Sequence, residues 1–290
     1  MEIPLPPEIT EEDIQKCRDA GDYCPVMFEW YKYVSQIAYF YASIQLNSPA
    51  IKDIPKIHHS VLIGLLNRCS RLMLSNVTLS HEGLFGETTS IIDRSIFESA
   101  IKLSWLCTKG DIDSFNRFIA EGLKTEIEFK TKIASNIEER GGDRIAIEKR
   151  MLNSIGNYIG KSELSEDEIV NSKNLPNLAQ MIEVVGHDRL AYIVGQKIGS
   201  HHVHGTWVSL WFHYVEEENG IIHPRGHNTP THVNQYAYVP LVVLDAISAY
   251  INFVCIEAED AKAMNFLIEG ISEKIQNLFQ EVVGSDNDVV

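Results

Sequence analysis

The stretch that decides the fold is ETTSIIDRSIFESAIKLSWLCTKG, which runs from Glu87 to Gly110. Its large apolar residues do not keep to one side of a helix, and they are Ile91, Ile92, Ile96, Phe97, Ile101, Leu103, Trp105 and Leu106. A helix that is apolar almost all round is stable only when other elements surround it. We therefore predict a central helix over residues 87–109, ended by Gly110, inside a multi-helix bundle.

The segments on both sides of this stretch also have the patterns of helices. Residues 59–79 repeat apolar side chains at i, i+3, i+4 and i+7, and residues 27–46 are crowded with aromatic side chains. Two further helices are predicted near the C-terminus, over residues 236–255 and 260–282, and a short one begins after Thr10 and ends at Gly21. No strand pattern of useful length is evident, so the predicted fold class is all-α.

The helices divide the chain into three predicted parts. Residues 1–55 form an N-terminal helical arm together with an aromatic helix that packs on the core. Residues 56–282 form the helical-bundle domain, and residues 283–290 form a disordered tail because they are too polar to order themselves. Within the bundle domain, residues 216–232 have no helical period and contain several helix breakers, which predicts a loop or a lid.

Composition excludes several classes of protein. Forty acidic and 25 basic residues give a formal charge of −15, which disfavours binding to nucleic acid or to anionic lipid. The acidic, proline-rich N-terminus is unlike a secretory signal, and no apolar run is long enough to span a membrane, so we expect a cytoplasmic protein. The five cysteines are odd in number and form no C-x-x-C pair, which argues against disulfides and against a cysteine-built zinc site.

Two short motifs carry a resemblance to a known family. The run RSIFESAIKLSWL at 94–106 is followed about 100 residues later by GSHHVHGTW at 199–207. The pair resembles a bacterial family of all-helical proteins of unknown function, DUF5677, in which an Arg-x-x-x-Glu lies on one helix and a Ser-x-x-x-His-Gly ends another. Those positions are Arg94, Glu98, Ser200, His204 and Gly205, and the likeness spans roughly residues 59–255. The resemblance implies a helical fold and brings no activity with it.

A looser similarity connects the chain with HEPN-type helical bundles, many of which are RNases in toxin and phage-defence systems. Their signature is an arginine followed, after four to six residues, by a histidine on the same helix. The predicted helices that carry Arg94 and Arg189 have no histidine at this spacing. The similarity implies an RNase activity, and the missing histidine is where this chain departs from the signature and argues against that activity.

Four polar residues interrupt the apolar surface of the central helix. Glu87, Arg94 and Glu98 stand at i, i+7 and i+11, and Lys102 follows Glu98 by four, so the four lie along one stripe. In one interpretation Arg94 and Glu98 form a buried structural pair that clamps a neighbouring helix. In the other, Arg94 binds an anionic substrate and Glu98 is a general base, with Glu87 and Lys102 as further binding residues.

Histidines are concentrated in one region, with seven of the eleven between His201 and His232. In GSHHVHGTW, His204 is the candidate catalytic histidine, and Ser200 and His201 are candidate binding residues. The histidines of the following segment, His223, His227 and His232, are spaced by four and five residues, which matches no zinc signature. We therefore predict no metal ligand and no cofactor.

Two functions from different classes follow from these observations. The first is a non-enzymatic helical protein that acts through a protein partner or through self-association, as an interaction or regulatory component of a bacterial stress or phage-defence module. The second is a hydrolase or a HEPN-like RNase that uses Arg94, Glu98 and His204. The negative charge and the missing arginine-to-histidine spacing favour the first.

Overall fold

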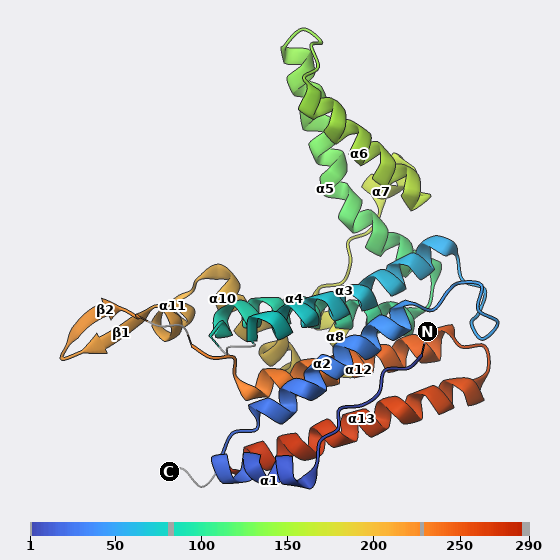
Figure 1. Cartoon of the computed structure of the whole chain (residues 1–290). Coiled ribbons are helices and arrows are strands. Elements are labelled where there is room, and N and C mark those ends of the chain that lie inside the picture. The colour runs from blue at the N-terminus through green and yellow to red at the C-terminus, as the bar shows by residue number, and fades with distance from the viewer. Residues whose placement is uncertain (1, 81–83, 227–228, 286–290) are drawn as a thin grey trace.

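The computed structural model describes residues 2–80, 84–226 and 229–285. Within them the chain is an all-α multi-helix bundle with one small two-stranded addition, which confirms the predicted fold class. Figure 1 shows three parts: a bundle of long helices, a helical hairpin that projects from one end of it, and a short β-hairpin at the opposite end.

The bundle is built around α4 (Gly86–Lys109), as the sequence predicts. Helix α4 packs against α3 (Lys56–Ser80), α12 (Val233–Val254), and α8 (Leu178–Val184), and its side chains Ile96, Ile101 and Trp105 are almost fully buried. Residues from several sides of the helix are buried because different helices cover them. The central position of α4 follows directly from its all-round apolar composition.

The N-terminal aromatic helix is part of the same core. Helix α2 (Cys24–Ala42) packs against α3 and α12 and buries Tyr31 and Tyr41. Before it, α1 (Glu11–Ala20) is capped by Thr10 and ended by Gly21 in the left-handed conformation, at the predicted residues. The last helix, α13 (Ala258–Ser285), lies along α12 and α2 (Figure 1).

The two C-terminal helices differ from the sequence predictions, α13 in its length and α12 in its hydropathy. Helix α13 includes residues 283–285, which the sequence analysis placed in the tail, and residues 286–290 lie outside the described part of the chain. Helix α12 is long and apolar enough to cross a membrane, but most of its window of highest hydropathy is buried by the surrounding helices. Its apolar character is explained by its place in the core of the bundle.

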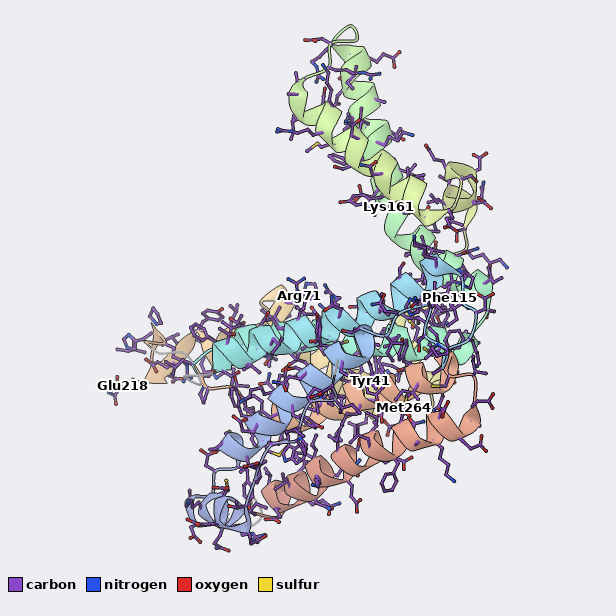
Figure 2. The ribbon with its side chains drawn as sticks, turned by 45° about the vertical axis from the view of Figure 1, so that its right-hand side comes forward. Tyr41, Arg71, Phe115, Lys161, Glu218 and Met264 are labelled. Atoms are coloured by element: carbon purple, nitrogen blue, oxygen red, sulfur yellow. The ribbon has the colours of Figure 1, made fainter. Side chains whose placement is uncertain are left out.

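A helical hairpin projects from the end of the bundle (Figure 1). It consists of α5 (Ile112–Glu139), capped by Asp111, together with α6 (Ala146–Ser162) and the short α7 (Glu166–Asn171). Two small apolar clusters, separate from the main core, hold it together: Ala120 with Leu123 and Ile169, and Ile133 with Ile137 and Ile155. Figure 2 shows Phe115 at the base of α5 and Lys161 at the end of α6 that is nearer to the bundle.

The segment from residue 189 to residue 207 is broken into several short helical pieces. It consists of α9 (Arg189–Tyr192), a π-helical turn η1 (Ile193–Ile198), and α10 (Gly199–His204), which Gly205 ends in the left-handed conformation. After this break comes α11 (Trp207–His213). The π-helical turn lies against α4, where Gly195 of the turn and Gly199 at the start of α10 let their backbones approach the side chains of Phe97 and Arg94 closely.

The structure corrects the predicted absence of strands. Strands β1 (Val215–Glu218) and β2 (Ile221–Pro224) form an antiparallel hairpin inside the segment that was predicted to be a loop. Asn219 and Gly220 connect them, and both have positive φ. An Asn-Gly pair is a strong signal for a two-residue hairpin turn, and the sequence analysis overlooked it, because the glutamates at 216–218 hide the apolar alternation that usually accompanies it.

Contact between η1 and α4 depends on a missing side chain at Gly195. A Cβ at this position would lie 2.5 Å from the ring of Phe97, which is buried in the core. We expect Gly195→Ala to lower the free energy of unfolding by about 1 to 3 kcal/mol because neither the ring nor the helix can yield freely. Chemical denaturation followed by circular dichroism measures this loss.

Gly64→Ala is the matched control. Gly64 is also helical, but it is exposed on α3 and no atom lies within 4 Å of the added Cβ. Here alanine should stabilise the protein by about 0.5 to 1 kcal/mol because it restricts the unfolded chain. A Gly195→Ala protein as stable as Gly64→Ala would show that η1 can move away from α4 at no cost.

Candidate functional site

A pocket of about 160 Å³ lies between α4, the η1–α10 segment and the first turns of α12. Apolar side chains form most of its wall, and its polar lining includes Asp93, Arg94, His202 and Gln235. It adjoins a wider groove of about 600 Å³, with which it shares Ser90, Ile198, His202, Asn234 and Gln235. The pocket therefore combines an apolar interior with several ionisable groups and has a route to solvent.

Asp93 is buried and is held by donors from three other helices. Its Oδ1 accepts from the Tyr31 hydroxyl of α2 at 3.1 Å and from Nδ2 of Asn76 of α3 at 2.6 Å. Its Oδ2 accepts from Nε2 of Gln235 of α12 at 2.5 Å. Both carboxylate oxygens are thus satisfied, as a buried carboxylate requires. The four residues connect the four central helices of the bundle.

Burial raises the pKa of Asp93 to about 7, although the hydrogen bonds from Gln235, Tyr31 and Asn76 act in the opposite direction. The three donors are neutral, so they stabilise the charge less than water would. Asp93 consequently exchanges its proton near neutral pH. A carboxyl group of this kind at the wall of a pocket is typical of acid-base or binding sites, and structural networks also produce it.

Arg94 lies next to Asp93 in sequence but faces the η1–α10 segment. When the Gln196 amide is oriented with its oxygen toward the guanidinium, Oε1 accepts from Nη2 at 2.8 Å and from Nε at 3.2 Å. The aliphatic part of Arg94 packs against Gly199, where an added Cβ would lie 2.9 Å from the Cβ of Arg94. Among the described residues Arg94 has no carboxylate partner within ion-pair distance.

The predicted buried pair of Arg94 and Glu98 does not form. Glu98 instead binds Lys102 with an Oε1–Nζ distance of 2.6 Å, and the two side chains are 38% and 28% exposed. Glu98 is not among the residues that line the pocket with Arg94. Helical spacing allows either pairing, because Arg94 and Lys102 are each four residues from Glu98. The surroundings decide it, since the Arg94 guanidinium turns toward Gln196 of η1.

Glu87, a predicted binding residue, holds the segment that follows α10. Its Oε1 accepts from the Ser209 hydroxyl at 2.5 Å, and its Oε2 accepts from the hydroxyl of Tyr214. Ser209 lies on α11 and Tyr214 follows it, so one carboxylate at the start of α4 fixes the orientation of α11 against the bundle. Its role in the structure is to anchor this segment.

The histidine side chains of GSHHVHGTW lie in different surroundings. His202 lines the pocket, and its ring lies 5.0 Å from that of His213. Burial lowers the pKa of both, and for His202 the nearby His213 lowers it further, so both are neutral at neutral pH. His201 shares a hydrogen bond of 2.7 Å with Thr206, and Ser200 donates to the carbonyl oxygen of Gln196.

His204, the predicted catalytic histidine, is exposed and is absent from the lining of the pocket that contains Arg94. The structure therefore does not place Arg94, Glu98 and His204 in one pocket. No group of three or more metal-ligating side chains is assembled within residues 2–80, 84–226 and 229–285. His227 lies outside the described residues.

Asp93 is the residue that the sequence analysis missed. It stands beside Arg94 on the most apolar helix of the chain, where an acidic residue is costly unless it has partners. The signal was therefore present in DRSIFE at 93–98. Asp93 is not part of the polar stripe at i, i+7 and i+11, because it lies on the adjacent, more deeply buried side of α4.

A second feature is an apolar arm, which we define as residues 207–224, comprising α11 and the β-hairpin. Its side chains Trp207, Val208, Leu210, Trp211, Phe212, Tyr214, Ile221 and Ile222 are each at least 36% exposed, and Trp207 reaches 69%. The two tryptophan rings lie 5.2 Å apart. Figure 1 shows the arm extending beyond the end of the bundle, and Figure 2 shows Glu218 at its far end. Such a density of exposed large apolar side chains is unusual on a protein surface.

The raised pKa of Asp93 predicts a specific dependence of stability on pH. The folded state retains the Asp93 proton up to about pH 7, whereas the unfolded state loses it near pH 3.9, so unfolding releases a proton between these values. The free energy of unfolding should therefore fall as pH rises from about 4 to 7, by up to about 4 kcal/mol from this group. Asp93→Asn should remove this contribution, as measured by urea unfolding across that range.

Asp53→Asn serves as the control because Asp53 is an exposed aspartate. Its unfolding free energy should follow the wild-type pH dependence. If Asp93→Asn follows the same curve as wild type, Asp93 does not retain its proton in the folded protein.

Comparison with known proteins gives one match. Residues 59–222, more than half of the chain, match the model of a family of unknown function, DUF5677. The matched region begins at the residue expected from the motifs and ends within β2, earlier than expected. No curated protein and no solved structure matches the chain. The match covers α4, the walls of the pocket from η1 and α10, and nearly all of the apolar arm, and the chain is a member of the DUF5677 family.

Proposed function

We propose that the protein is a non-enzymatic interaction protein that self-associates through its apolar arm. The observation that carries this proposal is the concentration of exposed large apolar side chains in residues 207–224. Monomeric proteins rarely expose a continuous apolar surface of this kind. Aromatic side chains, which are abundant in the arm, are also enriched at the centres of protein interfaces.

A permanent partner explains the β-hairpin better than a transient one. Both strands are largely exposed, and Ile221 and Ile222, on opposite faces of β2, are each 59% exposed. An isolated two-stranded hairpin is marginally stable in water, and its outer edges present unpaired backbone groups. A partner that covers both faces of the β-hairpin would therefore stabilise the arm. A second copy of the chain can supply such cover wherever the protein is present, and symmetric dimers are the most common assemblies.

The charges of the arm are compatible with this arrangement. Glu217 and Glu218 are exposed near the tip of the hairpin, away from the tryptophans at its base. Charged residues are tolerated at the rim of an interface, where water still reaches them. The Glu87 anchor fixes α11 on its own bundle, so the arm meets a partner in a defined orientation.

The wider role we propose is that of a regulatory component in a cytoplasmic stress or phage-defence module of bacteria. The motive for this proposal is the looser resemblance of the sequence to HEPN-type bundles, because the matched family is one of unknown function. Genes that neighbour those of family members would test it, because a recurrent partner gene for a nuclease or an antitoxin names the pathway. The alternative, a hydrolase or HEPN-like RNase, requires Glu98 and His204 near Arg94, and the pocket around Arg94 is lined by neither.

Self-association is tested by sedimentation equilibrium of the full chain. We expect a dimer, and we expect Trp207→Glu and Ile222→Glu each to raise its dissociation constant by at least about 10-fold, because each buries a charge in an apolar interface. Phe266→Glu is the matched control: Phe266 is 77% exposed on α13, away from the arm, and its substitution should leave the constant unchanged. A monomeric wild type, or equal effects of all three changes, would contradict the proposal.

A further inference from the structure

The pocket beside α4 has the composition of a binding site for a small molecule. Its apolar wall is formed by Phe97, Val194, Ile198, Tyr238 and Val239. A mostly apolar cavity with a few convergent polar groups is the usual form of a ligand site in proteins. Its closeness to the π-helical turn is also typical, since π-helical turns are frequent at functional sites.

Arg94 determines the charge of the ligand. Its side chain is half-buried at the pocket, where it contacts the neutral Gln196 amide and packs against the backbone of Gly199. With Nη2 and Nε directed at Gln196, the Nη1 group remains as a donor. A guanidinium without a carboxylate partner, at the wall of an apolar pocket, favours an anionic group there.

Asp93 determines the pH range in which an anion is accepted. It lines the same pocket, so its ionised form would repel a bound anion. The titratable and charged groups around it and in the pocket are Tyr31 from α2, Tyr236 and Tyr238 from α12, Arg94 on α4 itself and His202 from α10, whereas α3 contributes the neutral Asn76. The pKa values of the three tyrosines are raised and that of His202 is lowered, so at neutral pH Asp93 is the group that changes charge.

We infer that this pocket binds a small, mostly apolar carboxylate, with the carboxylate on Arg94 and the apolar body against Phe97, Ile198 and Val239. Binding is favoured while Asp93 is protonated and weakens as Asp93 ionises. The inference is independent of the proposed self-association, because it uses the pocket and no residue of the arm.

The probes are benzoate and hexanoate, each paired with its uncharged amide, benzamide or hexanamide. Dissociation constants are measured by calorimetry or ligand-observed NMR on the full chain at about pH 6, where Asp93 is protonated. We expect at least one of the two carboxylates to bind with a dissociation constant of about 1 mM or below, and its amide at least about 10-fold more weakly. Absence of carboxylate binding, or equal binding of acid and amide, overturns the inference.

Two variants assign the binding to this pocket. Arg94→Met keeps the aliphatic contact with Gly199 but removes the guanidinium, and it should weaken carboxylate binding by at least about 10-fold. Arg71→Met is the matched control, because Arg71 is exposed on α3 and does not line this pocket (Figure 2). Carboxylate binding that survives Arg94→Met, or that is lost equally in Arg71→Met, lies elsewhere on the protein and overturns the inference.

The pH dependence separates Asp93 from its neighbours. Between about pH 6 and pH 8 the wild-type dissociation constant should rise several-fold as Asp93 ionises. His202→Gln should retain this rise, and Asp93→Asn should remove it while still binding the carboxylate. If Asp93→Asn does not fold, the dissociation constants of wild type and His202→Gln, measured across the same pH range, test the role of Asp93. A constant affinity across this range in both proteins contradicts the role assigned to Asp93.

Discussion

The bundle depends on the burial of one carboxylate. Asp93 lies on the central helix, and its oxygens receive hydrogen bonds from α2, α3 and α12. Each of these helices must keep its register, because a shift of one residue would remove a donor and leave a buried acid without a partner. Apolar packing brings the helices together. The Asp93 network fixes which side of each of them faces α4.

The network also places the surfaces that we associate with function. Gln235, which donates to Asp93, lies in the first turn of α12, and the backbone N–H of His232 donates to its Oε1. One wall of the pocket is therefore built from the same residues that stabilise the core. The opposite wall, η1 and α10, approaches α4 closely because Gly195 and Gly199 have no side chains. The pocket is the space between a rigid polar network and a closely packed π-helical turn.

Pocket and arm are adjacent, and α10 and α11 connect them in the chain. His202 lines the pocket and its ring contacts that of His213, the last residue of α11. Glu87 holds α11 through Ser209. A single segment thus contributes one wall of the pocket and the base of the apolar arm. The family match spans α10 and α11, whereas the α12 wall of the pocket and the last two residues of the arm lie beyond its end at residue 222.

The sequence by itself determined the helical class and the central position of residues 87–109, because an apolar helix has no stable place except inside a bundle. It also determined the caps at Thr10 and Gly21, which depend on local hydrogen bonds. Only the tertiary structure decided the partners of the polar residues. Arg94 turned to Gln196 and Glu98 to Lys102, and Asp93, unremarked in sequence, received three donors from residues 17 to 142 positions away. Spacing along one helix fixes which side chains share a face, whereas the charges and donors opposite that face come from distant parts of the chain.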